Sequence, residues 1–445
     1  MALALPGIRA RRELPAVIAN VAVFAGAVVV GPKASVGFVL LACVLALSAA
    51  LVRRPQRGLL VLAALVPLNG LLIVIPHPSA LNGWKEALVV ATLLATFAAP
   101  SDARAAPASR LPGWAPAVIG LVALALASGL AVGGLQALVG LKVGYFFLLA
   151  AVAAWRCPLD ARERDRLVTI LMVMGVLTAA YGLVQQVLGA ERLNAFGYPY
   201  NTTIRFAGGS LRSFSTFNQP FGFGFFQMLV LLIGIPQALA EPQRRRNRLF
   251  LLALPLLALG LLSSIVRGAW LGAAVGMAYL ASHRYRVLLL LVPLAVLAVA
   301  FLPSEALSSS STTERTTSWE QNVGRVFSNP FGVGLGASGA AAEKAAIGTG
   351  VRTYQPDNFY FKTVLELGVL GLWMLVLLLA GAFSASRAAA GRLDGRDAAL
   401  AAGVAAMVAA AAAASFVATY FEIFPMDLFF WLLLTVVARC DRTSR

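Results

Sequence analysis

The residues best suited to chemistry in this sequence are arginines and one aspartate at the edges of apolar stretches. Arg267 lies in the run LLSSIVRGAWLG, between two apolar stretches with almost no polar chain around it. An arginine inside a membrane is costly unless it faces a cavity or an anion. Asp357 follows a proline in QPDNFYF, where another apolar stretch begins. A carboxylate in that place either caps a helix or accepts a proton from a substrate hydroxyl.

The composition indicates what surrounds these residues. The chain has 445 residues, of which 60% are hydrophobic and only 12% are charged. A soluble protein carries about 25% charged residues, so this is an integral membrane protein. The net charge of +17 does not indicate nucleic-acid binding, because the basic residues gather at the ends of apolar segments. The three cysteines and two histidines are too dispersed for a disulfide framework or a metal site, so no metal site is expected.

The apolar segments have the length of membrane helices rather than of barrel strands. The sequence predicts an all-α polytopic membrane protein with about 12–14 transmembrane helices, since some of the segments are short enough to be tilted, re-entrant or fused. The segments run near residues 15–31, 35–52, 58–75, 84–99, 115–133, 136–155, 167–188, 218–240, 249–265, 268–282, 287–302, 358–383, 398–419 and 427–439.

Arginine clusters follow every second segment, for example after residues 52, 99, 155, 240 and 383. This pattern predicts cytoplasmic termini and places the remaining connections outside. Two outward loops are long, at residues 189–217 and 303–357. We therefore divide the chain into N-terminal helices (1–166), central helices with the first long loop (167–302), the second loop (303–357) and C-terminal helices (358–445).

Several basic residues oppose this topology rule because they fall on the outward side. For any single one, a solvated loop charge is the simpler interpretation, and that interpretation is weakest for Arg267. The outward basic residues are Arg192, Arg205, Arg212, Arg267, Arg315, Arg325, Lys344 and Arg352.

Three features of the second loop and the helix after it have both a functional and a structural interpretation. The run from Gly334 to Gly339 matches GxGxxG, but no strand precedes it and it faces outward, so we reject nucleotide binding. Lys362 and Glu366 are one helical turn apart and can pair, and Glu366 is expected to be structural. Asp357 remains either an N-cap or a base.

The order of motifs resembles the O-antigen ligase and Wzy-type polymerase superfamily. Five pieces carry the resemblance, which covers roughly residues 181–372. They are AAYGLVQQVLG, RSFSTFNQPFG, SSIVRGAWLG, NPFGVGLG and DNFYFKTVLELGVLGL. Each piece is weak alone, but their order and the predicted topology agree with the family pattern.

The resemblance implies a GT-C-like, metal-independent glycosyltransferase. It implies a donor glycan on undecaprenyl pyrophosphate, at the periplasmic face of a bacterial inner membrane. Arg212 and Arg267 are expected to bind the pyrophosphate, because the planar guanidinium suits phosphate oxygens. Asp357 is the leading base. Further substrate-binding candidates are Arg205, Arg325, Arg352, Asn358 and Tyr360.

Two departures from the family pattern bear on the reaction. Ligase members have a histidine where this chain has Asp357, and Arg267 follows valine instead of serine. The missing histidine favours a polymerase of oligosaccharide repeat units, as in O-antigen or exopolysaccharide synthesis, over transfer to lipid A–core or to a protein. A flippase for the same lipids is the alternative of another class, but the paired broken helices and repeats of a transporter are not evident. Besides membrane lipids, a chain-length regulator and a flippase are the expected partners.

Overall fold

The computed structural model describes residues 32–100, 111–287, 323–346 and 354–443. Within these ranges the protein is all-α apart from one two-stranded hairpin, which confirms the predicted fold class. Among the described residues, six helices are long and apolar enough to cross a membrane, or eight if each of two bent pairs counts as one span. The predicted segment 15–31, residues 288–302 of the segment 287–302, and Arg315 and Arg352 lie outside the described residues, so the total of 12–14 stays a prediction.

The described helices follow the predicted apolar segments, and several segments contain a break or bend. They are α2 (Pro32–Leu51), α3 (Gln56–Leu65), α4 (Trp84–Ala98), α5 (Ala115–Val132), α6 (Gly134–Tyr145), α7 (Leu148–Arg156), α8 (Ala161–Ala195), α9 (Pro220–Ala240), α10 (Arg245–Leu252), α11 (Leu254–Ser263), α12 (Arg267–His283), α16 (Gly339–Ala345), α17 (Phe359–Arg392), α18 (Gly395–Ala414) and α19 (Met426–Thr443). Short 3₁₀ turns are η1 (Val66–Ile73), η2 (Ser79–Gly83) and η4 (Tyr420–Glu422), and the hairpin pairs β1 (Arg205–Ala207) with β2 (Ser210–Arg212).

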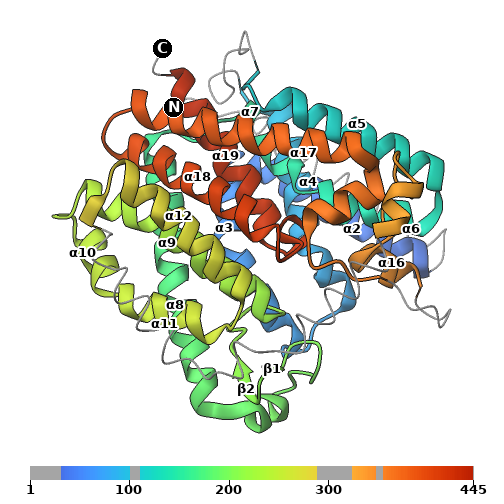
Figure 1. Ribbon diagram of the computed structural model, residues 1–445, viewed down its shortest axis with the longest axis horizontal. Helices are drawn as coiled ribbons and strands as arrows, with labels where there is room; N and C mark the ends of the chain where they lie inside the picture. The colour runs from blue at the N-terminus through green and yellow to red at the C-terminus, as the bar shows by residue number, and fades with distance from the viewer. Residues whose placement is uncertain (1–31, 101–110, 288–322, 347–353, 444–445) are drawn as a thin grey trace, which may run out of the picture.

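The centre of the bundle is formed by α9 and the alanine-rich α18, which pack against each other and against α12 (Figure 1). Both central helices are buried along most of their length. Small residues allow the backbones to approach closely. A Cβ on Gly403 of α18 would lie 2.8 Å from the Leu232 carbonyl oxygen of α9, and one on Gly276 of α12 would lie 3.0 Å from the Ala406 carbonyl oxygen. Close packing of this kind holds the helices that position the site.

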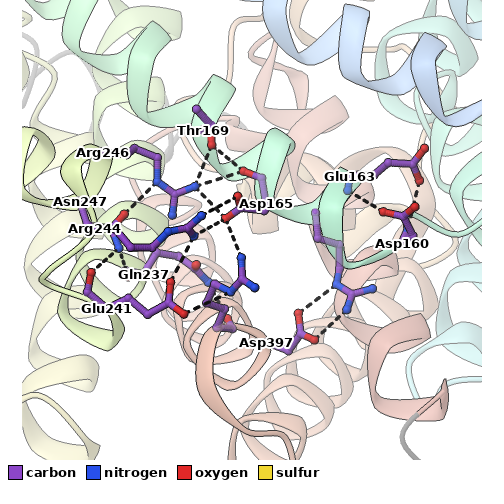
Figure 2. A network of polar contacts seen from close by, with 12 residues as sticks. Asp160, Glu163, Asp165, Thr169, Gln237, Glu241, Arg244, Arg246, Asn247 and Asp397 are labelled. Carbon is purple, nitrogen blue, oxygen red and sulfur yellow. Dashed lines mark hydrogen bonds and ion pairs between the residues drawn. The ribbon is translucent and has the colours of Figure 1, made fainter.

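One end of the bundle is joined by ion pairs between three connections that the sequence places on the same side (Figure 2). Asp165, near the start of α8, lies 2.9 Å from Arg244 and from Arg246, and 3.2 Å from Arg396. Arg164 binds both carboxylate oxygens of Asp397, at 2.9 and 2.7 Å. We call these residues the ion-pair end. Their proximity agrees with the arginine pattern, because the three connections meet in space.

Helix α17 is broken at Gly368, whose φ is 70° and ψ −172°. The break frees backbone groups of α17, and the NPFGVGLG segment binds them. The amide of Val333 donates to Leu365 O at 2.8 Å, that of Gly334 donates to Glu366 O at 3.1 Å, and Val369 donates to Pro330 O at 3.0 Å. Irregular backbone inside a membrane protein requires such internal partners. Two motifs far apart in sequence therefore form one backbone joint.

Glycine is required on both sides of this joint. A Cβ on Gly368 would lie 2.4 Å from Pro330 O, and a Cβ on Gly332 would lie 2.4 Å from Glu366 O. Both residues have positive φ, which side chains disfavour. The GxGxxG run thus has a structural role: a Cβ on Gly336 would also meet backbone, the Gln136 oxygen of α6 at 2.6 Å.

Candidate functional site

The segment after the hairpin is fixed to α8 by two glutamines of the predicted QQ motif. The Gln185 side-chain oxygen accepts from the amides of Phe214 and Ser215 at 3.1 and 2.7 Å, and its nitrogen donates to Ser215 O at 2.9 Å. Gln186 donates to Ser213 Oγ at 2.7 Å. Gln185 is fully buried, so this clamp determines where the RSFST segment lies.

The same segment is joined to the start of α12. Ser213 donates its amide to Ser263 O at 2.9 Å, and Arg212 Nε donates to Ser264 O at 3.2 Å. Ile265, two residues before Arg267, has a φ of 48°, which is unusual for a β-branched residue. Strained backbone of this kind concentrates at functional sites. The RSFST and SSIVRG motifs are therefore neighbours in space.

Two arginines lie opposite each other on the hairpin and share one aromatic ring. Arg205 and Arg212 are Cα partners in the antiparallel register. Their guanidinium carbons lie 5.9 and 4.7 Å from the ring centroid of Phe221. Among the described residues Arg205 forms no salt bridge; its Nε donates to Thr202 O at 3.2 Å. Burial lowers the pKa of the Arg205 guanidinium, and the Glu343 carboxylate partly opposes this. The pair is suited to an incoming anion.

A cavity of about 550 Å³ opens beside this hairpin, and we call it the loop-side cavity. It is enclosed by the η1 turn, the hairpin, the start of α9, α16, the residues before α17 and the connection from α18 to α19. Its polar lining residues are Asn69, Arg205, Asn218, Gln219, Glu343, Gln355, Asp357, Thr419 and Glu422. A cation on one wall faces several carboxylates on the others.

Asp357 lines this cavity and is exposed, but it is not the N-cap of α17. The cap is Asn358, whose Oδ1 accepts from the amide of Phe361 at 2.9 Å. The capping interpretation of Asp357 is therefore wrong by one residue. An asparagine caps a helix as well as an aspartate does. Because Asn358 is the cap, Asp357 is not needed for that role, and it lines the cavity.

Of the other predicted site residues, some lie near the cavity and others hold helices in place. Tyr360 donates its hydroxyl to Ala412 O at 2.9 Å and contacts the ring of Phe416, so it ties α17 to α18. Asn358 is buried as the helix cap. Arg212 and Arg267 are not among the residues that line the cavity. The Arg212 guanidinium lies against the ring of Phe221, which does line it, and Arg267 begins α12 beside the Ser264 contact of Arg212. Arg325 is exposed in a short helical turn before NPFGVGLG.

The expected ion pair of Lys362 and Glu366 is present, and it has a third member that sequence reasoning missed. Lys362 Nζ contacts Glu366 Oε1 and lies 3.3 Å from Glu422 Oε1. Glu422 belongs to η4, in a connection that the sequence marked only as a short outward loop. The available signal was an acid flanked by aromatic residues in TYFEIFP, since ionisable residues at apolar segment ends favour function.

Residues 250–376 match the family model described as O-antigen ligase. This match supports an O-antigen ligase/Wzy-type family for the chain. Members of this family are glycosyl-transferring enzymes. A search of curated proteins finds no match to the chain.

The segment matched by the O-antigen ligase model contains Arg267, NPFGVGLG, Asp357 and the Lys362–Glu366 pair. The two hairpin arginines precede this segment and Glu422 follows it. The loop-side cavity is therefore assembled from residues inside and outside the matched segment. Its cationic wall comes from one side of the sequence and its buried carboxylate from the other.

Proposed function

We propose that this protein polymerises undecaprenyl-pyrophosphate-linked oligosaccharide repeat units at the periplasmic face of the inner membrane. The observation that carries the proposal is the loop-side cavity, where Arg205 and Asp357 face one space. The family match supports glycosyl transfer, and the aspartate in the place of the ligase histidine favours a polymerase.

The reaction transfers the anomeric carbon of a donor glycan from pyrophosphate to an acceptor hydroxyl. Negative charge grows on the leaving pyrophosphate as its bond to the sugar breaks. Fixed cations aimed at that charge lower the barrier more than they stabilise the bound donor. The stacked guanidinium groups of Arg205 and Arg212 supply such cations, and Arg267 begins the neighbouring helix. Arginine offers two parallel donors to phosphate oxygens, which a lysine cannot.

The acceptor hydroxyl must lie on the opposite side of the sugar from the leaving group. Asp357 is the exposed carboxylate at the edge of the cavity, and we assign it contact with the acceptor sugar. The donor lipid enters between helices, because its polyprenyl chain remains in the bilayer while its pyrophosphate reaches the loops.

The direct test supplies the purified protein in lipid nanodiscs with lipid-linked repeat units. A ladder of products longer than one repeat is expected, and its length is read by gel electrophoresis. If glycan is consumed only when lipid A–core is added, the protein is a ligase. Intact donor in both mixtures would contradict glycosyl transfer.

Reporter fusions test the side of the membrane. Fusions after Arg57, Arg110, Arg166, Arg248 and Arg396 are expected to report cytoplasm, and fusions within residues 303–357 the periplasm. A cytoplasmic signal from the long loop would overturn the periplasmic assignment.

A further inference from the structure

A buried cluster of one cation and two carboxylates lies beneath the loop-side cavity. Lys362 and Glu366 come from α17, and Glu422 from η4. The three side chains are 3%, 6% and 10% exposed. Ser338, just before α16, completes the cluster: its carbonyl oxygen accepts from Lys362 Nζ at 3.1 Å. If all three groups were ionised, the cluster would carry one excess negative charge.

The two carboxylates are held differently. Glu366 Oε1 accepts from the amide and hydroxyl of Ser338, at 3.0 and 2.7 Å, and from Lys362. Three donors fix it as the ion-pair partner of Lys362. Glu422 shares the same ammonium at 3.3 Å, and within the described part of the chain no other hydrogen bond reaches its side chain. Glu422 is thus the carboxylate with capacity left for another donor.

Glu422 is also the member that lines the loop-side cavity. Its Oε2 points toward Gly339, which lines the cavity too: a Cβ on Gly339 would lie 3.3 Å from that oxygen. On its other side, Glu422 borders a small apolar cavity with Tyr145, Lys362 and Glu366. Glu422 therefore contacts Lys362 through one carboxylate oxygen, and its side chain also borders the space where substrate would lie.

A purely structural ion pair does not need Glu422. Glu366 already neutralises the charge of Lys362, and a second buried carboxylate adds a desolvation cost. Buried ionisable groups of this kind in membrane proteins are functional by default.

We propose that Glu422 is the general base that removes the proton from the acceptor hydroxyl, with Lys362 as its positioning residue. This inference rests on the proposed glycosyl transfer. The hydroxyl proton passes to the Glu422 carboxylate while the acceptor oxygen bonds to the anomeric carbon. The bond from that carbon to pyrophosphate breaks, and its electron pair leaves with undecaprenyl pyrophosphate. Asp357 orients the acceptor at the cavity edge.

The environment of Glu422 suits this task. Burial raises the pKa of the Glu422 carboxyl above its ordinary value of 4.5, and the Glu366 charge adds to the rise, whereas Lys362 opposes it. The other charged groups around the same cavity are Arg205, Glu343 and Asp357. A base works best when its pKa lies near the working pH. Because the base must be ionised, kcat is expected to increase with pH through this raised pKa.

The test compares Glu422→Gln with the control Glu191→Gln, an exposed carboxylate near the end of α8 that does not line the cavity. Glu422→Gln is expected to lower kcat by about 10²-fold or more, to leave donor affinity unchanged and to abolish the pH dependence. Glu191→Gln is expected to keep kcat within about threefold and to retain the pH profile. Turnover is measured with the lipid-linked donor, and donor affinity by tryptophan fluorescence.

The outcomes separate this inference from the function on which it rests. Product from Glu422→Gln at the parent rate would overturn the base assignment alone. Absence of any glycan product from the parent protein would overturn both. If Glu422→Gln does not fold, two other measurements test the assignment of Glu422 as the base. They are the turnover of Glu422→Ala with added formate and the pH profile of the parent protein. Restored turnover with formate is expected, whereas no rescue by formate together with a parent kcat that does not depend on pH would overturn the assignment.

Discussion

The two ends of helix α8 hold their charges in opposite ways. At the ion-pair end, Arg164, Arg244, Arg246 and Arg396 each contact a carboxylate of Asp165, Glu241 or Asp397 (Figure 2). At the other end, where Gln185 clamps the RSFST segment, Arg205 stacks on Phe221 instead. Asp165 and Gln185 are 20 residues apart in one helix, which is about 30 Å and close to the thickness of a bilayer core.

The difference indicates two uses of charge. At the ion-pair end, cations that neighbouring carboxylates neutralise hold the connections between helices together. Such cations have little capacity left to bind an anionic ligand. A half-buried cation that has no carboxylate partner among the described residues, such as Arg205 at the loop-side cavity, destabilises the folded protein. A bound anion would offset that cost. We therefore expect substitutions at the loop side to change activity and those at the ion-pair end to change stability. The predictions below run from the largest expected effect to the smallest.

The strongest perturbation adds one methyl group at the break in α17. Gly368→Ala is expected to destabilise the protein by about 3 kcal/mol or more, through positive φ and a backbone clash. Gly391→Ala, near the other end of the same helix, meets nothing within 4 Å and is expected to be neutral or stabilising by up to about 1 kcal/mol. Thermal unfolding in detergent measures both. Equal melting temperatures for the two variants would show that the break does not require glycine.

The hairpin arginines test the cationic wall. Arg205→Ala combined with Arg212→Ala is expected to lower kcat/KM by about 10²- to 10⁴-fold, since each charge-assisted hydrogen bond contributes about 1.5–3 kcal/mol. The double lysine variant is expected to recover only part of this loss. Polymer formation from lipid-linked repeats is the measurement. Arg192→Ala, an exposed arginine at the same end, serves as the control, and an equal loss in that variant would contradict a specific role for the hairpin.

Substitutions at Asp357 and Asn358 distinguish orientation of the acceptor sugar from capping of helix α17. Asp357→Asn is expected to raise KM for the acceptor by about tenfold without changing the melting temperature, because Asp357 is not the cap. Asn358→Ala is expected to destabilise the protein by about 1 kcal/mol. Kinetics with varied acceptor and a melting curve for each variant distinguish the two effects. A melting temperature lowered by Asp357→Asn would return the capping role to Asp357.

The ion-pair end is expected to show the smallest effect on chemistry. Asp165→Asn removes the carboxylate shared by three arginines and is expected to destabilise the protein by about 1–2 kcal/mol. Specific activity of the folded fraction is expected to stay within about twofold, because the cavity lies at the far end of α8. The single pair Arg392–Asp441 provides the control, and Asp441→Asn is expected to cost less than about 1 kcal/mol. Activity lost from fully folded Asp165→Asn would break the distinction between the two ends.

Sequence alone determined the features that depend on local chain chemistry. Apolar segments of membrane length predicted the all-α fold and its helices. The motif order pointed to Arg212, Arg267 and Asp357, and the four-residue spacing of Lys362 and Glu366 predicted their pair. The fold and the ion pair follow from residue types at a fixed separation along the chain, whereas the three site residues were indicated by the resemblance to a known family.

Only the tertiary structure decided which distant residues share a space. Glu422 approaches Lys362 because the connection from α18 to α19 folds over the start of α17, and no spacing in the sequence encodes that contact. The same holds for the joint between NPFGVGLG and the break in α17, where backbone groups freed at one site are satisfied 30 or more residues away. The cap at Asn358 instead of Asp357 was decided by the backbone angle at which the helix begins. Local patterns give the parts, whereas hydrogen-bond satisfaction and close packing within the bundle select how those parts meet.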